Sequence, residues 1–231
     1  MGINLEGIVV IVGNYGSGKT EVSISLAANK RREGIDVRVA DLDLVNPYFR
    51  TREARKPLKA LGIDVVLPAE NYLQADLPIL NPAIAGMIRR PTQMTIIDVG
   101  GDDVGATVLA SLADAFRGKP YHMLQIVNPM RPFTDTVTGC MKIRREIEAA
   151  SKMTINGLVA NPNLIDETRP QDISRGFELV KNYSKKSGLG LYFIAITTDL
   201  LTEIDANQFE CPILPIQRQL VPPWKKAEKL Y

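Results

Sequence analysis

The stretch Gly13-Asn14-Tyr15-Gly16-Ser17-Gly18-Lys19-Thr20, read as GNYGSGKT, decides the fold of this chain. It follows an apolar run at residues 8–12 and precedes a segment, beginning at Glu21, whose apolar positions have helical spacing. The stretch fits the pattern G-x-x-x-x-G-K-[ST], in which glycines let successive backbone N–H groups turn toward a polyphosphate. The order of strand, glycine-rich loop and helix N-terminus predicts a phosphate-binding loop.

Each part of this loop has an expected task. We expect the loop and Glu21 to contact the nucleotide, with Gly13, Asn14, Tyr15, Gly16, Ser17 and Gly18 forming the cradle. Lys19 neutralises phosphate charge and is assigned to catalysis as well as binding. Thr20 offers its hydroxyl to Mg²⁺. The alternative is an ordinary glycine-rich turn between a strand and a helix, which the complete motif disfavours.

Length and composition indicate one soluble α/β unit over residues 1–231. The chain has 45% hydrophobic residues, and no linker rich in Pro, Gly or Ser divides it. Its net charge of +2 gives no global argument for binding nucleic acid or an anionic membrane. The first residues, MGINLEGIVV, lack a signal-peptide layout, and no apolar run reaches membrane-spanning length. We therefore expect a cytoplasmic protein without a membrane segment.

The cysteines and the histidine do not indicate a metal site. Cys140 and Cys211 are far apart in sequence and form no C-x-x-C pair, so we expect two small core residues. His122 lies in a strand-like apolar run with no other His or Cys near it in sequence, and we expect a hydrogen-bonded strand residue rather than a metal ligand.

Short apolar runs alternate with helical segments along the chain, which predicts a three-layer, doubly wound, mostly parallel sheet of seven or eight strands. Glycines Gly34, Gly118 and Gly188 follow three of the helices as C-terminal stops. Prolines at 68, 78 and 82 leave residues 70–90 without a regular assignment. The expected strands cover residues 8–12, 37–40, 64–67, 94–97, 123–127, 155–160, 191–196 and 213–214, and the clearest helices cover 19–33, 104–116, 134–151 and 171–186.

Carboxylates follow two of the expected strands. The second strand is followed by Asp41-Leu42-Asp43 and the fourth by Asp98-Val99-Gly100-Gly101. We assign Asp98 to Mg²⁺, Asp43 to the attacking water or the metal's outer shell, and Asp41 to the support of Asp43. Gly101 brings a backbone N–H against the γ-phosphate. The alternative is that these aspartates only cap turns.

Together, GNYGSGKT, DLDLVNPYFR and IIDVGG resemble the nucleotide-binding domain shared by MinD, ParA, the nitrogenase iron protein and cobyrinic acid a,c-diamide synthase. This branch of P-loop NTPases also contains the signal-recognition and nickel-insertion GTPases. The resemblance implies Mg²⁺-dependent hydrolysis and frequently a nucleotide-sandwich dimer. It also implies two switch segments, at residues 43–50 and 100–105. The expected partners are thus the nucleotide, a second copy in the presence of ATP, and a protein that the sequence does not identify.

The sequence departs from the resemblance at one loop residue and in one missing motif. MinD and ParA proteins carry a lysine at the second loop position, which reaches the partner's nucleotide, and this chain has Asn14 there. An amide does not neutralise developing negative charge. Arg50, Arg52 or Arg131 are candidates for the missing cation, although each taken singly reads as a surface arginine. C-x-x-C, which many metal-handling relatives use, is also absent.

The base-binding positions favour adenine. Related GTPases carry an aspartate that reads guanine where this chain has Leu164, whereas Asn161 is retained for the adenine edge. Asp166 is near enough in sequence to be recruited for guanine instead. A later apolar run resembles the family's base-packing segment, and its Pro215 would lie against the ring of the base.

The sequence therefore favours an ATPase with ATP and Mg²⁺ as cofactors, whose switches respond to the γ-phosphate. Three alternatives stay open at this stage. They are a GTP-driven metal-insertion chaperone, a kinase or amide-forming synthetase, and a regulatory module that binds nucleotide but barely hydrolyses it.

Overall fold

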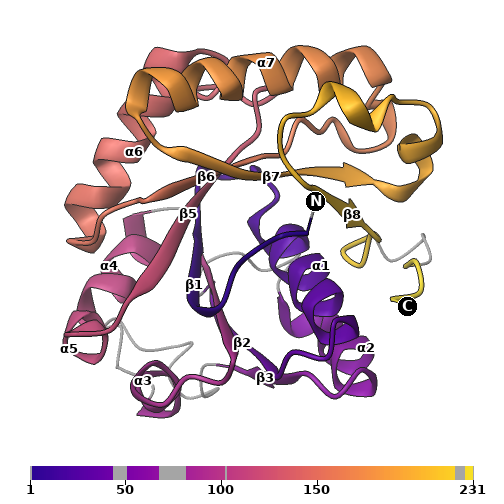
Figure 1. Ribbon diagram of the computed structural model, residues 1–231. Helices are drawn as coiled ribbons and strands as arrows, with labels where there is room; N and C mark the ends of the chain where they lie inside the picture. The colour runs from indigo at the N-terminus through magenta and orange to yellow at the C-terminus, as the bar shows by residue number, and fades with distance from the viewer. Residues whose placement is uncertain (1, 44–50, 68–81, 102, 222–226, 231) are drawn as a thin grey trace.

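The computed structural model describes residues 2–43, 51–67, 82–101, 103–221 and 227–230 (Figure 1). The strands form one sheet in the order β3-β2-β4-β1-β5-β6-β7-β8. Every neighbouring pair is parallel, which confirms the predicted doubly wound α/β fold. The strands are β1 (Gly7–Val12), β2 (Val37–Leu42), β3 (Asp64–Val66), β4 (Met94–Val99), β5 (Tyr121–Val127), β6 (Gly157–Ala160), β7 (Gly190–Thr197) and β8 (Ile213–Ile216).

Helices cover both faces of the sheet and complete three layers (Figure 1). On one face lie α1 (Lys19–Arg32) and α2 (Arg55–Ala60). The other face carries α3 (Pro82–Arg89), α4 (Asp103–Ser111), α5 (Ala113–Phe116), α6 (Val137–Ser151) and α7 (Pro170–Ser187). Short 3₁₀ helices span Thr51–Ala54, Ile165–Glu167, Thr198–Thr202 and Ala206–Gln208.

Strand β1 lies inside the sheet, between β4 and β5. Its residues Val9, Val10 and Ile11 are 0% exposed because helices cover the strand on both faces. The chain leaves β1 toward β2 and β3 on one side, and β5 to β8 extend the sheet on the other. Parallel sheets bind ligands beyond the carboxyl ends of their strands, at the point where the strand order reverses. The loop after β1 occupies this point.

Several expected boundaries were wrong, each for a local reason. The expected helix at residues 104–116 is two helices, α4 and α5, separated at Leu112. Helix α6 begins at Val137 because Thr136 is its N-cap and accepts the N–H of Gly139 at 3.1 Å. Helix α3, in the segment without an assignment, starts at Pro82, a residue type tolerated in the first turn.

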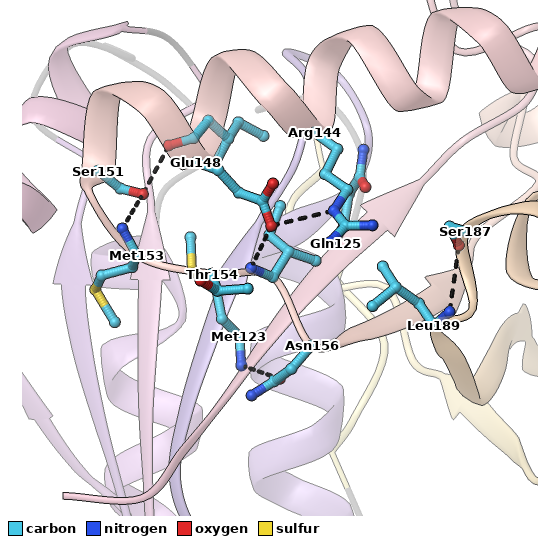
Figure 2. A network of polar contacts seen from close by, with 12 residues as sticks. Met123, Gln125, Arg144, Glu148, Ser151, Met153, Thr154, Asn156, Ser187 and Leu189 are labelled. Carbon is cyan, nitrogen blue, oxygen red and sulfur yellow. Dashed lines mark hydrogen bonds and ion pairs between the residues drawn. The ribbon is translucent and has the colours of Figure 1, made fainter.

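Strand β6 begins two residues later than expected, and a side chain from α6 binds the backbone N–H of Ile155 just before it. The Ile155 N–H donates to Glu148 Oε1 at 2.9 Å, and the same oxygen accepts from Arg144 Nε at 3.1 Å. The Asn156 side chain accepts from the N–H of Met123 at 2.8 Å. Figure 2 shows this network, which joins the last turns of α6 to β5 and to the segment before β6.

The cysteines and the histidine occupy structural positions. Cys140 and Cys211 are buried free thiols, and burial raises their pKa to about 12 and about 11, respectively. His122 Nδ1 lies 3.1 Å from the hydroxyl of Tyr192, and partial burial lowers the pKa of its imidazole. Among the described helices, none is both long and apolar enough to cross a bilayer.

Candidate functional site

The loop from Gly13 to Thr20 connects β1 directly to α1. Its backbone closes with a bond from the Ser17 N–H to the Asn14 carbonyl at 3.2 Å, and Gly18 takes a left-handed conformation at the N-terminus of the helix. Lys19 is 7% exposed, and its ammonium donates to the Asn14 carbonyl at 3.1 Å. The lysine therefore curls back over the loop to which it belongs.

Gly101, which the sequence assigns to the γ-phosphate, lies against the same loop. A Cβ added at this position would lie 2.5 Å from Lys19 Nζ and 3.0 Å from the backbone nitrogen of Tyr15. A side chain is thus disfavoured where the backbone after β4 approaches the loop, because Lys19 and Tyr15 would have to shift. Lys19, at the end of the connection from β1 to α1, therefore lies close to Gly101, at the start of the connection from β4 to α4.

The two buried carboxylates Asp41 and Asp98 are register neighbours on β2 and β4, both 0% exposed. The strands continue through these residues, so the aspartates lie inside the strands rather than after them as expected. Burial raises the pKa of Asp98 to about 7, the negative charge of Asp41 adds to the shift, and hydrogen bonds from Thr51 and Thr20 oppose it. Asp41 Oδ1 accepts the N–H of Asp43 at 2.9 Å, which gives Asp41 the supporting position expected for it.

The residues present fit a magnesium ion. Mg²⁺ prefers oxygen ligands and is usually held by one or two carboxylates together with substrate phosphates and water. Asp98 and Thr20, which the sequence assigns to the metal, share a hydrogen bond. A buried pair of carboxylates such as Asp41 and Asp98 favours a divalent cation, since the cation would offset the charge that burial leaves unsolvated. Asp43 is 7% exposed and follows directly after β2.

Asn161 comes directly after β6 and is 4% exposed. Its side-chain nitrogen donates to the Ser17 carbonyl at 2.7 Å, so the amide that was expected at the base is also a support for the phosphate loop. Asp166, from the turn that follows, pairs with Arg218 at 2.5 Å. This ion pair joins the chain after β6 to the chain after β8.

Glu21 is expected to contact nucleotide, but its carboxylate is engaged elsewhere. Its two oxygens accept the N–H groups of Gln219 at 2.7 Å and Leu220 at 3.0 Å. Burial raises the pKa of Glu21 to about 7, although both hydrogen bonds oppose the shift. Pro215 lies in the edge strand β8, opposite Ile196 of β7. The segment that reaches the first turn of α1 is therefore Gln219–Leu220, beyond Pro215.

Of the three arginines considered as the missing cation, only Arg131 has a described side chain. Arg50 lies outside the described residues, as do residues 44–50 and 102 of the two switch segments, and the side chain of Arg52 is also outside them. Arg131 is described, and it packs against Gly16 of the phosphate loop. Asn14 donates through Nδ2 to the carbonyl of Pro132 at 3.1 Å.

Two contributors were missed by sequence reasoning. Thr51 is 0% exposed, and its hydroxyl donates to Asp98 Oδ2 at 2.8 Å. Ser23 donates to the other oxygen of Asp98 at 3.4 Å. Neither residue belongs to a motif, and the only available signal was the position of Thr51 just after the first expected switch. A cavity of about 120 Å³ lies between the loops after β1 and β4 and helices α4 and α6, and its lining includes Gly13, Asn14, Gly100, Gly101, Ala106 and Ile143.

No protein-family model and no curated protein matches the chain. Solved structures with a similar fold include cell division protein FtsY from Thermotoga maritima, with a TM-score of 0.58, 19% identity and 84% of this chain covered. The 54 kDa protein of the signal recognition particle from Aeropyrum pernix K1, in complex with GDP, has a TM-score of 0.54 and 17% identity over 84% of this chain. Chloroplast FtsY from Physcomitrella patens has a TM-score of 0.56 and 15% identity over 84% of this chain.

This chain spans 62%, 42% and 59% of these three proteins, respectively. At these identities the likeness establishes only that this chain shares the α/β fold of these proteins. The doubly wound α/β fold predicted from the sequence is confirmed, and nothing in the comparisons singles out the MinD and ParA subfamily.

Proposed function

We propose that this protein binds and hydrolyses a nucleoside triphosphate with Mg²⁺, with ATP as the preferred substrate. The observation that carries the proposal is the position of Lys19, whose ammonium lies 3.1 Å from the Asn14 carbonyl. The ammonium is also close to Gly101, where an added Cβ would be 2.5 Å away. A buried cation among backbone N–H groups at a helix N-terminus is suited to a polyphosphate rather than to a single carboxylate.

The residues around Lys19 have separate tasks in this proposal. The loop N–H groups and Lys19 orient the phosphates, and Thr20 with Asp98 would hold Mg²⁺, which supplies positive charge to the phosphate oxygens. Asp43 orients the attacking water. The backbone N–H of Asp43 donates to Asp41 Oδ1 at 2.9 Å, which fixes the backbone of Asp43 at the carboxyl end of β2. Catalysis by positioning and charge is the usual mode of phosphoryl transfer.

Adenine is the base that the site favours. Leu164 offers no carboxylate to guanine, and the nearby Asp166 has Oδ1 within 2.5 Å of Arg218 Nη1. A guanine would have to compete with this ion pair for the aspartate. Sites that read a base through a carboxylate discriminate strongly, whereas sites without one discriminate weakly, so the expected preference for ATP is modest.

GTP is the second candidate, on two specific observations. The similar protein from Aeropyrum pernix K1 is in complex with GDP. Asp166 has a side chain that is 55% exposed, and an exposed ion pair contributes little stability. A guanine could therefore displace Arg218 at small cost.

We further propose that the γ-phosphate is coupled to a second copy of the chain or to a protein partner. Support comes from Thr51, whose bond to Asp98 connects the chain just after the first switch to the proposed metal site. Gly101 makes the corresponding approach from the second switch. Loops held through phosphate and Mg²⁺ contacts loosen after hydrolysis, which gives such coupling a physical basis.

The test is equilibrium binding and phosphate release with ATP and with GTP, each with and without Mg²⁺. Lys19→Ala should weaken triphosphate binding by about 10- to 100-fold, because charge-assisted hydrogen bonds to the phosphates are lost. Lys142→Ala is the matched control, since that side chain is 72% exposed on α6. Equal affinity of the Lys19→Ala variant and the parent would exclude the proposal. Phosphate release without an added acceptor would count against a dedicated kinase or synthetase.

A further inference from the structure

The connection between β5 and α6 lies against the phosphate loop, and we call residues 128–134 of this connection the Arg131 loop. Asn14 joins the two loops, since its Nδ2 donates to the Pro132 carbonyl at 3.1 Å and its Oδ1 accepts the N–H of Tyr15 at 2.8 Å. Asn14 stands where resembling ATPases have a lysine. In this protein the side chain at this position links the two loops, because Asn14 binds Pro132, the residue next to Arg131.

The guanidinium of Arg131 packs on the phosphate loop. A Cβ added at Gly16 would lie 3.4 Å from Arg131 Nε and 3.7 Å from its Cζ. The Nε is fully buried and has no hydrogen-bond partner. Among the described residues, three buried side-chain polar atoms lack a partner, namely Arg131 Nε, Ser17 Oγ and Ser25 Oγ, and only the first belongs to this contact. Buried donors without partners are rare in native structures, and because this Nε is enclosed by protein atoms, a ligand would be contacted by the terminal nitrogens of the guanidinium, whose side chain is half-buried.

The Arg131 loop holds its shape through its own hydrogen bonds. The Arg131 N–H donates to the Asn128 carbonyl at 3.1 Å, and the same carbonyl accepts the Thr134 hydroxyl at 2.7 Å. Thr134 is 1% exposed and Asn128 2%. Phe133 has a φ of 69°, a strained conformation for a bulky residue that persists only where surrounding contacts impose it. The backbone that carries Arg131 is therefore held in place by contacts within the protein.

We propose that Arg131 contacts the phosphate chain of the nucleotide in its own protomer and supplies the cation that Asn14 does not. The inference rests on the proposed function. In hydrolysis the water oxygen bonds to the γ-phosphorus while the bond from that phosphorus to the β–γ bridging oxygen breaks. The electron pair stays on the β-phosphate, and the water proton passes to the released phosphate. The loop N–H groups hold the α and β phosphates, so a guanidinium against Gly16 is adjacent to the oxygens on which this charge develops.

The experiment compares Arg131→Ala, Arg131→Lys and the control Arg145→Ala, which removes an exposed arginine from α6. Steady-state turnover is measured together with equilibrium binding of the diphosphate and of a non-hydrolysable triphosphate analogue. We expect Arg131→Ala to lower kcat on the order of 100-fold, which is typical for the loss of one preorganised donor. Diphosphate affinity should change by about tenfold or less. Arg131→Lys should recover part of kcat, and added guanidinium should partly rescue Arg131→Ala, which a purely structural role would not allow.

A mixing experiment separates action within one chain from action across a dimer. Lys19→Ala retains Arg131, and Arg131→Ala retains Lys19, so a dimer that exchanges arginines would regain one competent site on mixing. Action within the chain predicts no recovery. Recovery on mixing, or a kcat for Arg131→Ala within twofold of the parent, would overturn the assignment. A parent that binds no nucleotide would instead overturn the proposed function itself.

Discussion

The hydroxyl of Thr51 donates a hydrogen bond of 2.8 Å to Asp98 Oδ2, across 47 positions of sequence and between two fully buried groups. Thr51→Val preserves the shape of the side chain but removes the donor. A buried acceptor that loses its partner costs about 1–3 kcal/mol, and the pKa of Asp98 should rise further because this bond opposes its rise. Urea denaturation near pH 8 measures the loss, with Thr51→Ser as the control that keeps the hydroxyl. A Thr51→Val variant as stable as the parent would show that the bond contributes nothing to folding.

Asp98→Asn and Asp43→Asn should separate metal binding from water activation. For Asp98→Asn, Mg²⁺-dependent turnover should fall at least about tenfold more than nucleotide affinity, since the metal acts mainly on the transition state. For Asp43→Asn, turnover should fall about 100-fold while nucleotide affinity stays nearly unchanged. Phosphate-release assays over a Mg²⁺ series, paired with calorimetric binding, provide both numbers. Full turnover in Asp43→Asn would reduce Asp43 to a residue of the turn held by Asp41.

The raised pKa of Asp98 makes the stability of the ligand-free protein depend on pH. The folded value is about 7 against an ordinary value of 3.8, so the folded state holds this proton more tightly than the unfolded chain. The associated stability is present below about pH 4 and is lost as the pH rises toward 7, at about 1.4 kcal/mol per pH unit. The free energy of unfolding of the parent should therefore fall over this window relative to Asp98→Asn. Parallel pH profiles for the two proteins in chelator would rule out the raised pKa.

Glu21 should control the order of the chain that follows β8. Glu21→Ala leaves the N–H groups of Gln219 and Leu220 without their acceptors, which costs about 1–3 kcal/mol if these groups stay buried. Hydrogen exchange of these two amides should accelerate, while the amides of β1 keep the protection of the parent. Glu21→Gln keeps one acceptor oxygen and should give an intermediate rate. Unchanged exchange at Gln219 and Leu220 in Glu21→Ala would show that other contacts hold the segment.

The sequence predicts those parts of the molecule that depend on local patterns. All the expected strands exist, because a buried parallel strand is a continuous apolar run that can be recognised without its neighbours. The connection from β1 to α1 through a glycine-rich loop was likewise predicted from eight consecutive residues. The contacts that arrange the site are different in kind. Thr51 with Asp98 and Asn14 with Pro132 are brought together only by the strand order, and no local pattern distinguishes them from other polar residues.

The helix boundaries failed for a related reason. The break between α4 and α5 at Leu112 has no proline or glycine to mark it, so helical spacing predicted one continuous helix. The commitment of Glu21 to Gln219 and Leu220 was equally hidden, since the acceptor and donors are almost 200 residues apart. Motif reasoning assigned Glu21 to the ligand, and the fold uses its carboxylate to hold another segment.

The central place of β1 in the sheet has a consequence for how the chain folds during synthesis. Strand β1 has β4 and β5 as its neighbours, and β5 ends only at Val127. The middle of the sheet therefore cannot close until Val127 has left the ribosome, and the apolar β1 has no final partners until β4 and β5 are made. Long-range parallel pairing of this kind folds slowly and exposes unpaired strand edges to aggregation. Helix α1, which contacts both β1 and β2, is the element available to cover β1 in the interval.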